Sequence, residues 1–488
     1  MTKPLKILYV SAELAPLAST GGLGDVANAL PRALHALGHD VRLAVPCYQA
    51  MPEHLRGAPM CNCDAPMGVR TVAGTFRLTT MPGTDIPLYL VQNDRYFDRP
   101  DIYGPGGNEY PDAMERFCFF SMAVLDGVGK GDWVPDVVHC NDWHTAIIPA
   151  HIKTRLATDP VWRGMPTILT IHNLAYQGEC PASKLPETGL SWALFTPDCL
   201  EFYGHINLMK AGIAFASRTT AVSPRYAREI QTPEFGGGLD GFLRTRARGL
   251  TGILNGIDYE RWNPDTDADI PANYTPDDLS GKAACKTALQ QEFNLPARDV
   301  PLFGMVSRIN WQKGFDLLPT ALDRALAGDI QVFILGSGDG PHEDACAAVA
   351  RRHPDRMRVV LRYAPPLARK VYAASDFFLM PSRFEPCGLS QLYALAYGAI
   401  PIVRRTGGLA DTVYPVTARG VEEGRSTGLV FVRASSAAIF AAMRRAVKLF
   451  EDKERLHAVR LAAMRQRFSW DASAVNYARL YRQAIRNP

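Results

Sequence analysis

Short apolar runs rich in β-branched residues alternate with helix-length segments along most of this 488-residue chain. In the first half these runs include "LKILYVSAE", "DVRLAVPCY", "PDVVHCND" and "PTILTIHN". Strands that are apolar almost throughout are typical of a parallel sheet that helices cover on both faces. The pattern therefore predicts a doubly wound α/β domain, with its first helix running from about Gly24 to Leu37.

The alternation stops once and then begins again. The stretch "NGIDYERWNPDTDADIPANYTPDD" has the composition of a connector, and strand-like runs return after it in "VPLFGMVSRI", "IQVFILGSGD", "MRVVLRYA", "DFFLMPSRF" and "GAIPIVRR". Because the chain is longer than one hydrophobic core usually organises, we expect two Rossmann-like α/β domains, 1–258 and 259–465, that face a deep cleft. A helical segment, 466–488, carries an apolar stripe that should pack back on the first domain.

Composition excludes several classes of protein. The residues are 47% hydrophobic and 21% charged, and a formal net charge of +4 on so long a chain does not mark a nucleic-acid binder. The longest uncharged run, 386–403, is interrupted by glycine and proline, so it predicts a buried helix and strand and not a membrane span. Ten scattered cysteines without zinc-site spacing, and an N-terminus without a secretory signal, predict a cytoplasmic protein with reduced thiols and no bound metal.

Two loops have similar sequences: "STGGLGDV" at 19–26 and "RTGGLADTV" at 405–413. In open parallel sheets the ligand lies at the carboxyl ends of the strands, near helix N-termini. Paired glycines let the backbone approach a phosphate or a sugar closely. One such loop in each domain predicts a ligand gripped from both sides, although Gly-Gly also serves simply to make a tight turn.

Charged side chains follow the strands of the second half. In "SRINWQKG", Arg308 and Lys313 stand between a strand and a helix, where a planar cation and a compact one suit a diphosphate. A solvated pair of surface charges is the alternative. In "RFEPCGLSQLYAL", the carboxylate of Glu385 could accept sugar hydroxyls, or stand at a helix N-terminus without a further role.

Polar side chains also follow two strands of the first half. They are candidates for holding sugar hydroxyls, because loops over a binding site begin at strand ends. They are Asp142, His144, His172 and Asn173, in "HCNDWHTA" and "TIHNLAYQG", while His139 and Asn141 could instead satisfy backbone groups. The chain has no His-Glu-x-x-His or Walker A motif, which disfavours a zincin and a P-loop enzyme.

Together the motifs resemble one family, the bacterial glycogen synthases and plant starch synthases, which are retaining glycosyltransferases of the GT-B fold. The motifs appear in the family's order as "TGGLGDV", "HCNDWHT", "TIHNLAYQG", "LMKAG", "TAVSPRYAREI", "LNGID", "SRINWQKG", "PSRFEPCGLSQLYAL" and "RRTGGLADTV". This resemblance covers essentially the whole chain. It implies transfer of glucose from ADP-glucose to the non-reducing end of an α-1,4-glucan such as glycogen, without metal or cofactor.

The same resemblance implies a role for each motif residue. The catalytic set is Arg308, Lys313, Glu385, His172 and Asp142, with the two cations on the departing diphosphate, Glu385 on the donor glucose, and Asp142 and His172 on the sugar from the other domain. The residues implied in donor binding are Ser19, Thr20, Gly21, Gly22, Asp25, Asn255, Tyr363, Cys387, Gly388, Leu389, Tyr393, Thr406, Gly407 and Gly408. Among them, Tyr363 would lie against the adenine and Tyr393 near the ribose.

One position departs from the family. The first loop of the family normally begins with lysine, and this chain has Ser19 there. The difference keeps two alternatives open: a GT-B glucosyltransferase with another donor, such as UDP-glucose, or another acceptor, and a weakly active glucan-binding paralogue. Because Arg308, Lys313 and Glu385 are all present, we expect an active glycosyltransferase.

Overall fold

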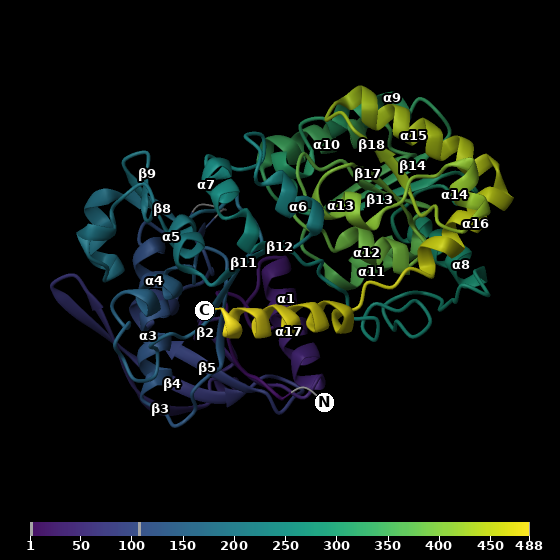
Figure 1. Ribbon diagram of the computed structural model, residues 1–488. Helices are drawn as coiled ribbons and strands as arrows, with labels where there is room; N and C mark the ends of the chain where they lie inside the picture. Colours follow the sequence, from purple (N-terminus) through teal and green to yellow (C-terminus); the bar gives the residue numbers. More distant parts are fainter. Residues whose placement is uncertain (1–2, 106–108, 488) are drawn as a thin grey trace. The chain divides into compact units, whose positions relative to one another are not determined.

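The computed structural model describes residues 3–105 and 109–487, which form two compact units (Figure 1). Unit 1 comprises Met1–Asn255 and Trp470–Pro488, and unit 2 comprises Gly256–Ser469. The sequence places these boundaries after residues 258 and 465. Both units are α/β, as the alternation of apolar runs predicts.

Unit 1 is built on a nine-stranded sheet in the order β12-β11-β7-β6-β1-β2-β5-β4-β3. Pairing is parallel from β12 to β5, whereas β4 and β3 are antiparallel additions at one edge. The strands are β1 (Lys6–Val10), β2 (Asp40–Pro46), β3 (Ala58–Met67), β4 (Arg70–Thr80), β5 (Pro87–Gln92), β6 (Val137–Asn141), β7 (Thr167–Ile171), β11 (Arg218–Ala221) and β12 (Leu250–Gly252). Every residue of β6 and β7 is buried, including the polar His139, Asn141, Thr167 and Thr170.

Helices cover this sheet, and a small three-stranded sheet joins it. The helices are α1 (Gly22–Ala36), α2 (Asp94–Phe97), α3 (Ala113–Gly129), α4 (Ile147–Lys153), α5 (Leu208–Phe215), α6 (Pro224–Glu229), α7 (Asp240–Thr245) and α17 (Trp470–Arg486). The small sheet has the order β8-β10-β9, formed by β8 (Glu179–Pro181), β10 (His205–Asn207) and β9 (Glu201–Phe202). The first helix, expected from about Gly24, begins two residues earlier, directly after Gly21.

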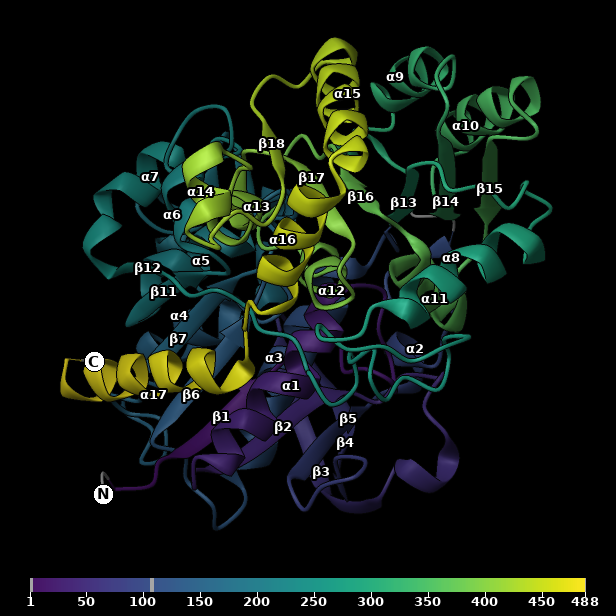
Figure 2. The same ribbon diagram turned by 90° about the vertical axis from the view of Figure 1, so that its right-hand side faces the viewer.

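Unit 2 has a six-stranded, wholly parallel sheet in the order β15-β14-β13-β16-β17-β18, part of which Figure 2 shows side by side. Its strands are β13 (Leu302–Val306), β14 (Gln331–Gly336), β15 (Met357–Leu361), β16 (Phe377–Met380), β17 (Ile400–Arg404) and β18 (Leu429–Phe431). Its helices are α8 (Ser280–Glu292), α9 (Leu318–Ala325), α10 (Gly340–Arg352), α11 (Pro365–Ala374), α12 (Ser390–Ala396), α13 (Gly407–Thr412), α14 (Ala418–Glu422), α15 (Ser436–Glu451) and α16 (Lys453–Met464).

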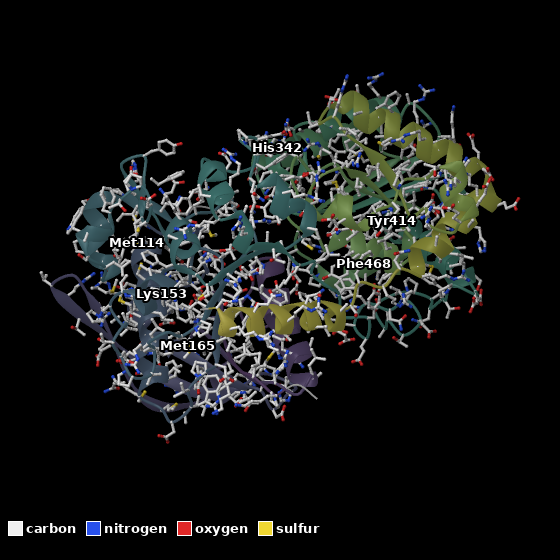
Figure 3. The ribbon with its side chains drawn as sticks, viewed as in Figure 1. Met114, Lys153, Met165, His342, Tyr414 and Phe468 are labelled. Carbon is white, nitrogen blue, oxygen red and sulfur yellow. The ribbon has the colours of Figure 1, made fainter. Side chains whose placement is uncertain are left out.

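The apolar strands of unit 2 supply two cores, one on each face of the sheet. In β14, Val332 and Ile334 belong to one core, and Phe333 and Leu335 belong to the other. Successive side chains of a strand point to opposite faces, so a strand covered on both sides is apolar at most positions. Side chains fill the space between sheet and helices in each unit (Figure 3).

The C-terminal helix α17 belongs to unit 1. It packs against α1, β6 and β7, and its Tyr481 hydroxyl lies 2.7 Å from Nδ1 of His139. Figure 1 shows α17 beside α1, although the two are at opposite ends of the sequence. The segment with connector composition packs on unit 2, because Ile257, Ile270 and Tyr274 are buried in that unit's core.

No helix of the described residues is both long and apolar enough to cross a membrane. All ten cysteines lie in the described part of the chain, and all are free thiols.

Candidate active site

The candidate site residues of unit 1 follow the ends of β6 and β7. Asp142, directly after β6, adopts a left-handed backbone with φ of 54° and is buried. One carboxylate oxygen, Oδ1, accepts hydrogen bonds from the backbone N–H of His172 at 2.7 Å and of Asn173 at 3.3 Å. Burial raises the pKa of Asp142 to about 7, against these two hydrogen bonds, which lower it. The structure thus joins Asp142 to the loop after β7.

The ring of His172 is held from the same strand end. Its Nε2 lies 2.9 Å from Oδ1 of Asn141, the last residue of β6. Burial lowers the pKa of His172 to about 3, so the ring is neutral near pH 7. A neutral imidazole offers one donor and one acceptor to its surroundings.

The other two histidines of the β6 motif are buried within unit 1 and do not join this cluster. His144 is stacked on Trp143 and Tyr103, with ring centroids 4.2 and 5.0 Å away. His139 bonds Tyr481 of α17 and, through Nε2, the hydroxyl of Thr170 at 2.7 Å. Their positions indicate that they pack within unit 1 and support its sheet, which is the usual structural role of a lone histidine.

The first Gly-Gly loop is organised by Glu13, which the sequence interpretation missed. Oε2 of Glu13 accepts the N–H of Thr20 at 2.8 Å and of Gly21 at 3.3 Å, and Oε1 accepts the hydroxyls of Thr20 at 3.0 Å and Tyr103 at 2.6 Å. Two of the amides expected to face a phosphate are thus bound to a carboxylate of the protein itself. The sequence signal for Glu13 was its position: it ends the stretch "SAE" directly after a buried strand, seven residues before Thr20.

Other predicted residues of unit 1 lie around this loop or at the unit's boundary. Ser19, Gly21 and Gly22 are exposed, and Asp25 stands in the first turn of α1. Asn255 is buried, and its Oδ1 has no hydrogen-bond partner among the described residues. A buried amide oxygen without a partner is costly and marks a place for a further donor.

In unit 2, the structure brings Lys313 and Glu385 together. Nζ of Lys313 lies 2.8 Å from Oε1 and 2.6 Å from Oε2 of Glu385, and Ser382 Oγ donates to Oε2 at 2.9 Å. Both charged side chains are largely buried, at 16% and 6% exposure. Arg308, after β13, is exposed. Lys313 is therefore a largely buried, paired charge and Arg308 is an exposed one, so the two do not form a solvated pair on the surface.

Local backbone geometry places Lys313 beside Glu385. The side chain of Asn310 accepts the N–H of Lys313 at 3.1 Å and caps the short helical turn Trp311–Lys313. Gly314 ends this turn with φ of 82°, and a Cβ there would lie 2.4 Å from the carbonyl oxygen of Pro381. Glycine at this position lets the lysine turn pack against the segment that carries Ser382 and Glu385.

The second Gly-Gly loop packs directly behind Glu385. A Cβ on Gly407 would lie 1.8 Å from the carbonyl oxygen of Glu385, and one on Gly408 would lie 2.0 Å from that of Cys387. The N–H of Gly408 donates to the carbonyl oxygens of Glu385 and Pro386, both at 3.1 Å. The space that these glycines leave is therefore filled by the protein's own backbone.

The remaining predicted residues of unit 2 surround the turn 385–389. Gly388 has φ of 73°, Leu389 precedes α12, and Thr406 is buried before α13. Tyr363 is 88% exposed. Tyr393 is instead stacked on Trp262 with centroids 3.7 Å apart, a partner that the sequence interpretation missed.

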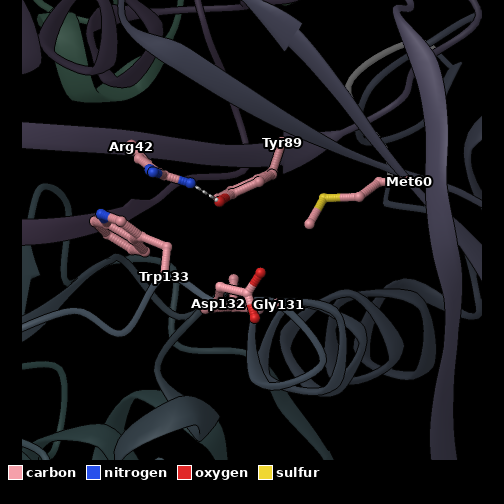
Figure 4. A pocket seen from close by; sticks show the side chains of 7 residues that line it. Arg42, Met60, Tyr89, Gly131, Asp132 and Trp133 are labelled. Atoms are coloured by element: carbon pink, nitrogen blue, oxygen red, sulfur yellow. Dashed lines mark hydrogen bonds between the residues drawn. The ribbon is translucent and has the colours of Figure 1, made fainter.

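Two cavities of unit 1 lie away from these residues. One of about 320 Å³ is lined by Arg42, Met60, Tyr89 and Trp133, among others, with Arg42 donating to the Tyr89 hydroxyl at 2.6 Å (Figure 4). A second, of about 170 Å³, lies by α3 and α4. No predicted site residue lines either cavity. Within residues 3–105 and 109–487, no group of three or more His, Cys, Asp or Glu side chains is arranged to hold a metal.

Two family models match parts of this chain. Residues 6–245 match the family model described as starch synthase catalytic domain, and 287–460 match glycosyl transferases group 1. The chain is 45% identical to glycogen synthases of Geotalea daltonii and Anaeromyxobacter dehalogenans, covering 99% and 98% of this chain and 99% of each relative. The chain belongs to the glycogen and starch synthase family. The family resemblance drawn from the motifs is thereby confirmed.

Solved structures agree with membership of the glycogen and starch synthase family. The catalytic domain of starch synthase IV from Arabidopsis thaliana, bound to ADP and acarbose, superposes with a TM-score of 0.91 at 33% identity, covering 99% of this chain and all of that one. A sucrose-phosphate synthase from Thermosynechococcus elongatus shares the fold alone, at a TM-score of 0.61 and 18% identity. The chain is a glycosyltransferase with the two-domain GT-B fold that the sequence predicts.

Proposed function

We propose that this glycosyltransferase transfers glucose from ADP-glucose to the non-reducing end of an α-1,4-glucan, with retention of the anomeric configuration. Its relatives are glycogen synthases along their whole length, and the starch synthase that it resembles was solved with ADP and acarbose. The observation in the site that carries the proposal is the ion pair of Lys313 with Glu385. It fixes a cation in the short turn Trp311–Lys313 that follows β13, in a position suited to a phosphate.

Charge on the leaving group explains why fixed cations are needed. As the bond between glucose and diphosphate breaks, negative charge develops on the diphosphate, and preorganised positive groups stabilise it. In this proposal Lys313 and the exposed Arg308 supply that charge, and the reaction needs neither a metal nor a cofactor. Lys313 is held in place before the donor arrives, so no reorganisation is needed during the reaction.

Glu385 has a positioning role in this proposal. Both of its carboxylate oxygens are engaged by Lys313, and Oε2 also accepts from Ser382. A carboxylate whose charge is balanced by a paired lysine is a poor nucleophile, unlike the one that attacks the sugar in retaining glycosidases, but its remaining lone pairs can still accept sugar hydroxyls. We therefore assign Glu385 to holding Lys313 and the donor glucose, and the acceptor hydroxyl to attack on the face that the diphosphate leaves.

Asp142 and His172 would contact the transferred sugar from unit 1. Within the described part of the chain, the hydrogen bonds of the Asp142 carboxylate all involve Oδ1, which leaves Oδ2 for a ligand. The exposed ring of Tyr363 would lie against the adenine, and the Tyr393–Trp262 stack would border the ribose. Thr20, Gly21 and Gly22 would bind the diphosphate through their amides, and the amides of Thr20 and Gly21 would first have to leave the Glu13 carboxylate.

The test is incorporation of label into glycogen from radiolabelled ADP-glucose or UDP-glucose, supplied separately to the purified protein. We expect incorporation from ADP-glucose. Incorporation from UDP-glucose alone would transfer the proposal to that donor, and Ser19, which stands where the family has lysine, would be the first residue to examine. Incorporation from neither donor would leave a glucan-binding protein as the better account.

A further inference from the structure

Asn141 makes three side-chain hydrogen bonds in the interior of unit 1. Its Nδ2 donates to the carbonyl oxygen of Val10 at 2.9 Å. Its Oδ1 accepts from the hydroxyl of Tyr9 at 2.9 Å and lies 2.9 Å from Nε2 of His172. Asn141 is fully buried, so none of these groups exchanges its partner for water.

The Val10 carbonyl fixes which way the amide of Asn141 points. A backbone carbonyl only accepts hydrogen bonds, so the NH₂ group, and not the oxygen, must face it. The amide oxygen then faces Tyr9 and His172. With the opposite orientation, two oxygens would meet at 2.9 Å inside the protein, at the cost of a buried unsatisfied acceptor.

The amide oxygen in turn fixes the proton of His172. Because Oδ1 of Asn141 only accepts, Nε2 of His172 must carry the hydrogen. The ring is neutral near pH 7, since burial lowers its pKa to about 3. Nδ1 is then without a hydrogen and can only accept, and within the described part of the chain no residue donates to it.

We propose that Asn141 is a positioning residue that holds His172 in the Nε2–H tautomer, so that Nδ1 meets the transferred sugar as an acceptor of one of its hydroxyls. The inference rests on the proposed function for the identity of the ligand, but the tautomer does not. It also makes the site specific: His172 distinguishes a hydroxyl, which donates, from a group of similar size that cannot donate.

The tautomer can be measured without any enzyme activity. In protein labelled with ¹⁵N-histidine, long-range ¹H–¹⁵N correlations distinguish a protonated ring nitrogen from an unprotonated one, and His172→Gln assigns the signal. We expect protonated Nε2 and unprotonated Nδ1 at pH 7 in the unaltered protein. Protonated Nδ1 there would overturn the proposal.

Two variants separate the role of Asn141 from that of its surroundings. Asn141→Leu removes the acceptor, and we expect the His172 signals to move toward a mixture of tautomers. Tyr9→Phe removes the other hydrogen bond to the same oxygen and leaves the bond to His172, so we expect the tautomer to stay. Retention of pure Nε2–H in folded Asn141→Leu would contradict the role given to Asn141.

Kinetics give an independent measurement. Asn141→Leu should lower kcat about tenfold, which corresponds to one hydrogen bond to substrate, with an unchanged KM for glycogen, and Tyr9→Phe should lower it less than threefold. A further comparison uses ADP-glucose analogues in which one hydroxyl is replaced by hydrogen or by fluorine. At the position that His172 contacts, both analogues should have equally low kcat. In Asn141→Leu, the difference in kcat between ADP-glucose and these analogues should be smaller than in the unaltered protein. A fluorine analogue that is as good as ADP-glucose at every position would overturn the acceptor role.

If the unaltered protein shows no transfer from any donor, the proposed function fails and the tautomer measurement still stands. If transfer occurs and Nδ1 is protonated, only this inference fails.

Discussion

The two Gly-Gly loops share the wording Thr-Gly-Gly-Leu but differ in what their glycines contact. In the first loop, Gly21 has extended backbone with φ of −171°, and a Cβ there would meet nothing within 4 Å. In the second, a Cβ on Gly407 or Gly408 would collide with the backbone of Glu385 or Cys387. The same letters therefore serve an open surface in unit 1 and a close backbone contact in unit 2.

The amides of the two loops differ in the same way. Side-chain oxygens of Glu13 accept the N–H groups of Thr20 and Gly21, whereas backbone oxygens accept the N–H of Gly408. A side chain can withdraw when a ligand arrives, but the backbone of a buried turn cannot. We infer that the first loop adapts to the donor, and that the second holds the turn carrying Glu385 and thereby Lys313.

The largest expected effect concerns Lys313, whose partner Glu385 lies in the turn that the second loop supports. Lys313→Ala should lower kcat for transfer from ADP-glucose by roughly 10² or more, because one preorganised charge on the leaving diphosphate is lost. Arg308→Ala should act in the same direction. Lys370→Ala is the matched control, since Lys370 pairs with Glu292 on the surface of the same unit. Near-normal turnover of both Lys313→Ala and Arg308→Ala would remove the diphosphate role from these cations.

The second largest effect tests the difference between the two Gly-Gly loops. Gly408→Ala should lower the free energy of unfolding by about 1 to 3 kcal/mol, because its methyl group must displace the Cys387 carbonyl. Gly21→Ala should change it by less than about 0.5 kcal/mol, since the position is open and its backbone suits any residue. Urea unfolding of both variants measures the difference. Equal stability losses would show that the loops are alike after all.

A smaller effect concerns the carboxylate of the first loop. Glu13→Gln replaces one acceptor oxygen with an NH₂ group, which cannot accept hydrogen bonds from the N–H and O–H donors that face it. The free energy needed to open the loop should therefore fall by about 1 kcal/mol. Backbone amides of Thr20 and Gly21 should exchange with deuterium about fivefold faster, at little cost to global stability. Glu53→Gln, on an exposed turn of the same unit, is the control. Unchanged exchange would mean that Glu13 does not order the loop.

Much of this molecule could be predicted from its sequence. The largely parallel sheet of unit 1 and the parallel sheet of unit 2 followed from apolar runs, and the places of Lys313 and Glu385 in turns after strands followed from their motifs. Glu13, Asn141 and Trp262 were missed or undervalued because their roles depend on partners brought together by folding: Glu13 with Tyr103, Asn141 with Val10 and His172. The close contact behind Gly407 and Gly408 was hidden for the same reason, since the colliding carbonyls lie some twenty residues earlier in the chain.

The smallest effect concerns Ser19, the exposed residue that begins the first loop. Ser19→Lys should raise transfer from ADP-glucose about twofold, the scale of an exposed ion pair, and the gain should shrink as salt is raised. Its Cβ already packs against Gly24, so the substitution adds only the outer part of the side chain. Ser19→Gln tests length without charge and should give no gain. An equal gain from both variants would contradict an electrostatic contact at this position.

The central claim, retaining transfer of glucose onto an α-1,4-glucan, is tested most directly by following one reaction by ¹H NMR. The purified protein is mixed with ADP-glucose and a short maltooligosaccharide, and the anomeric signals of donor, product and any free glucose are recorded with time. The account predicts one new α-1,4 anomeric signal for each ADP released. A β-anomeric product, or release of free glucose without elongation of the acceptor, would contradict it.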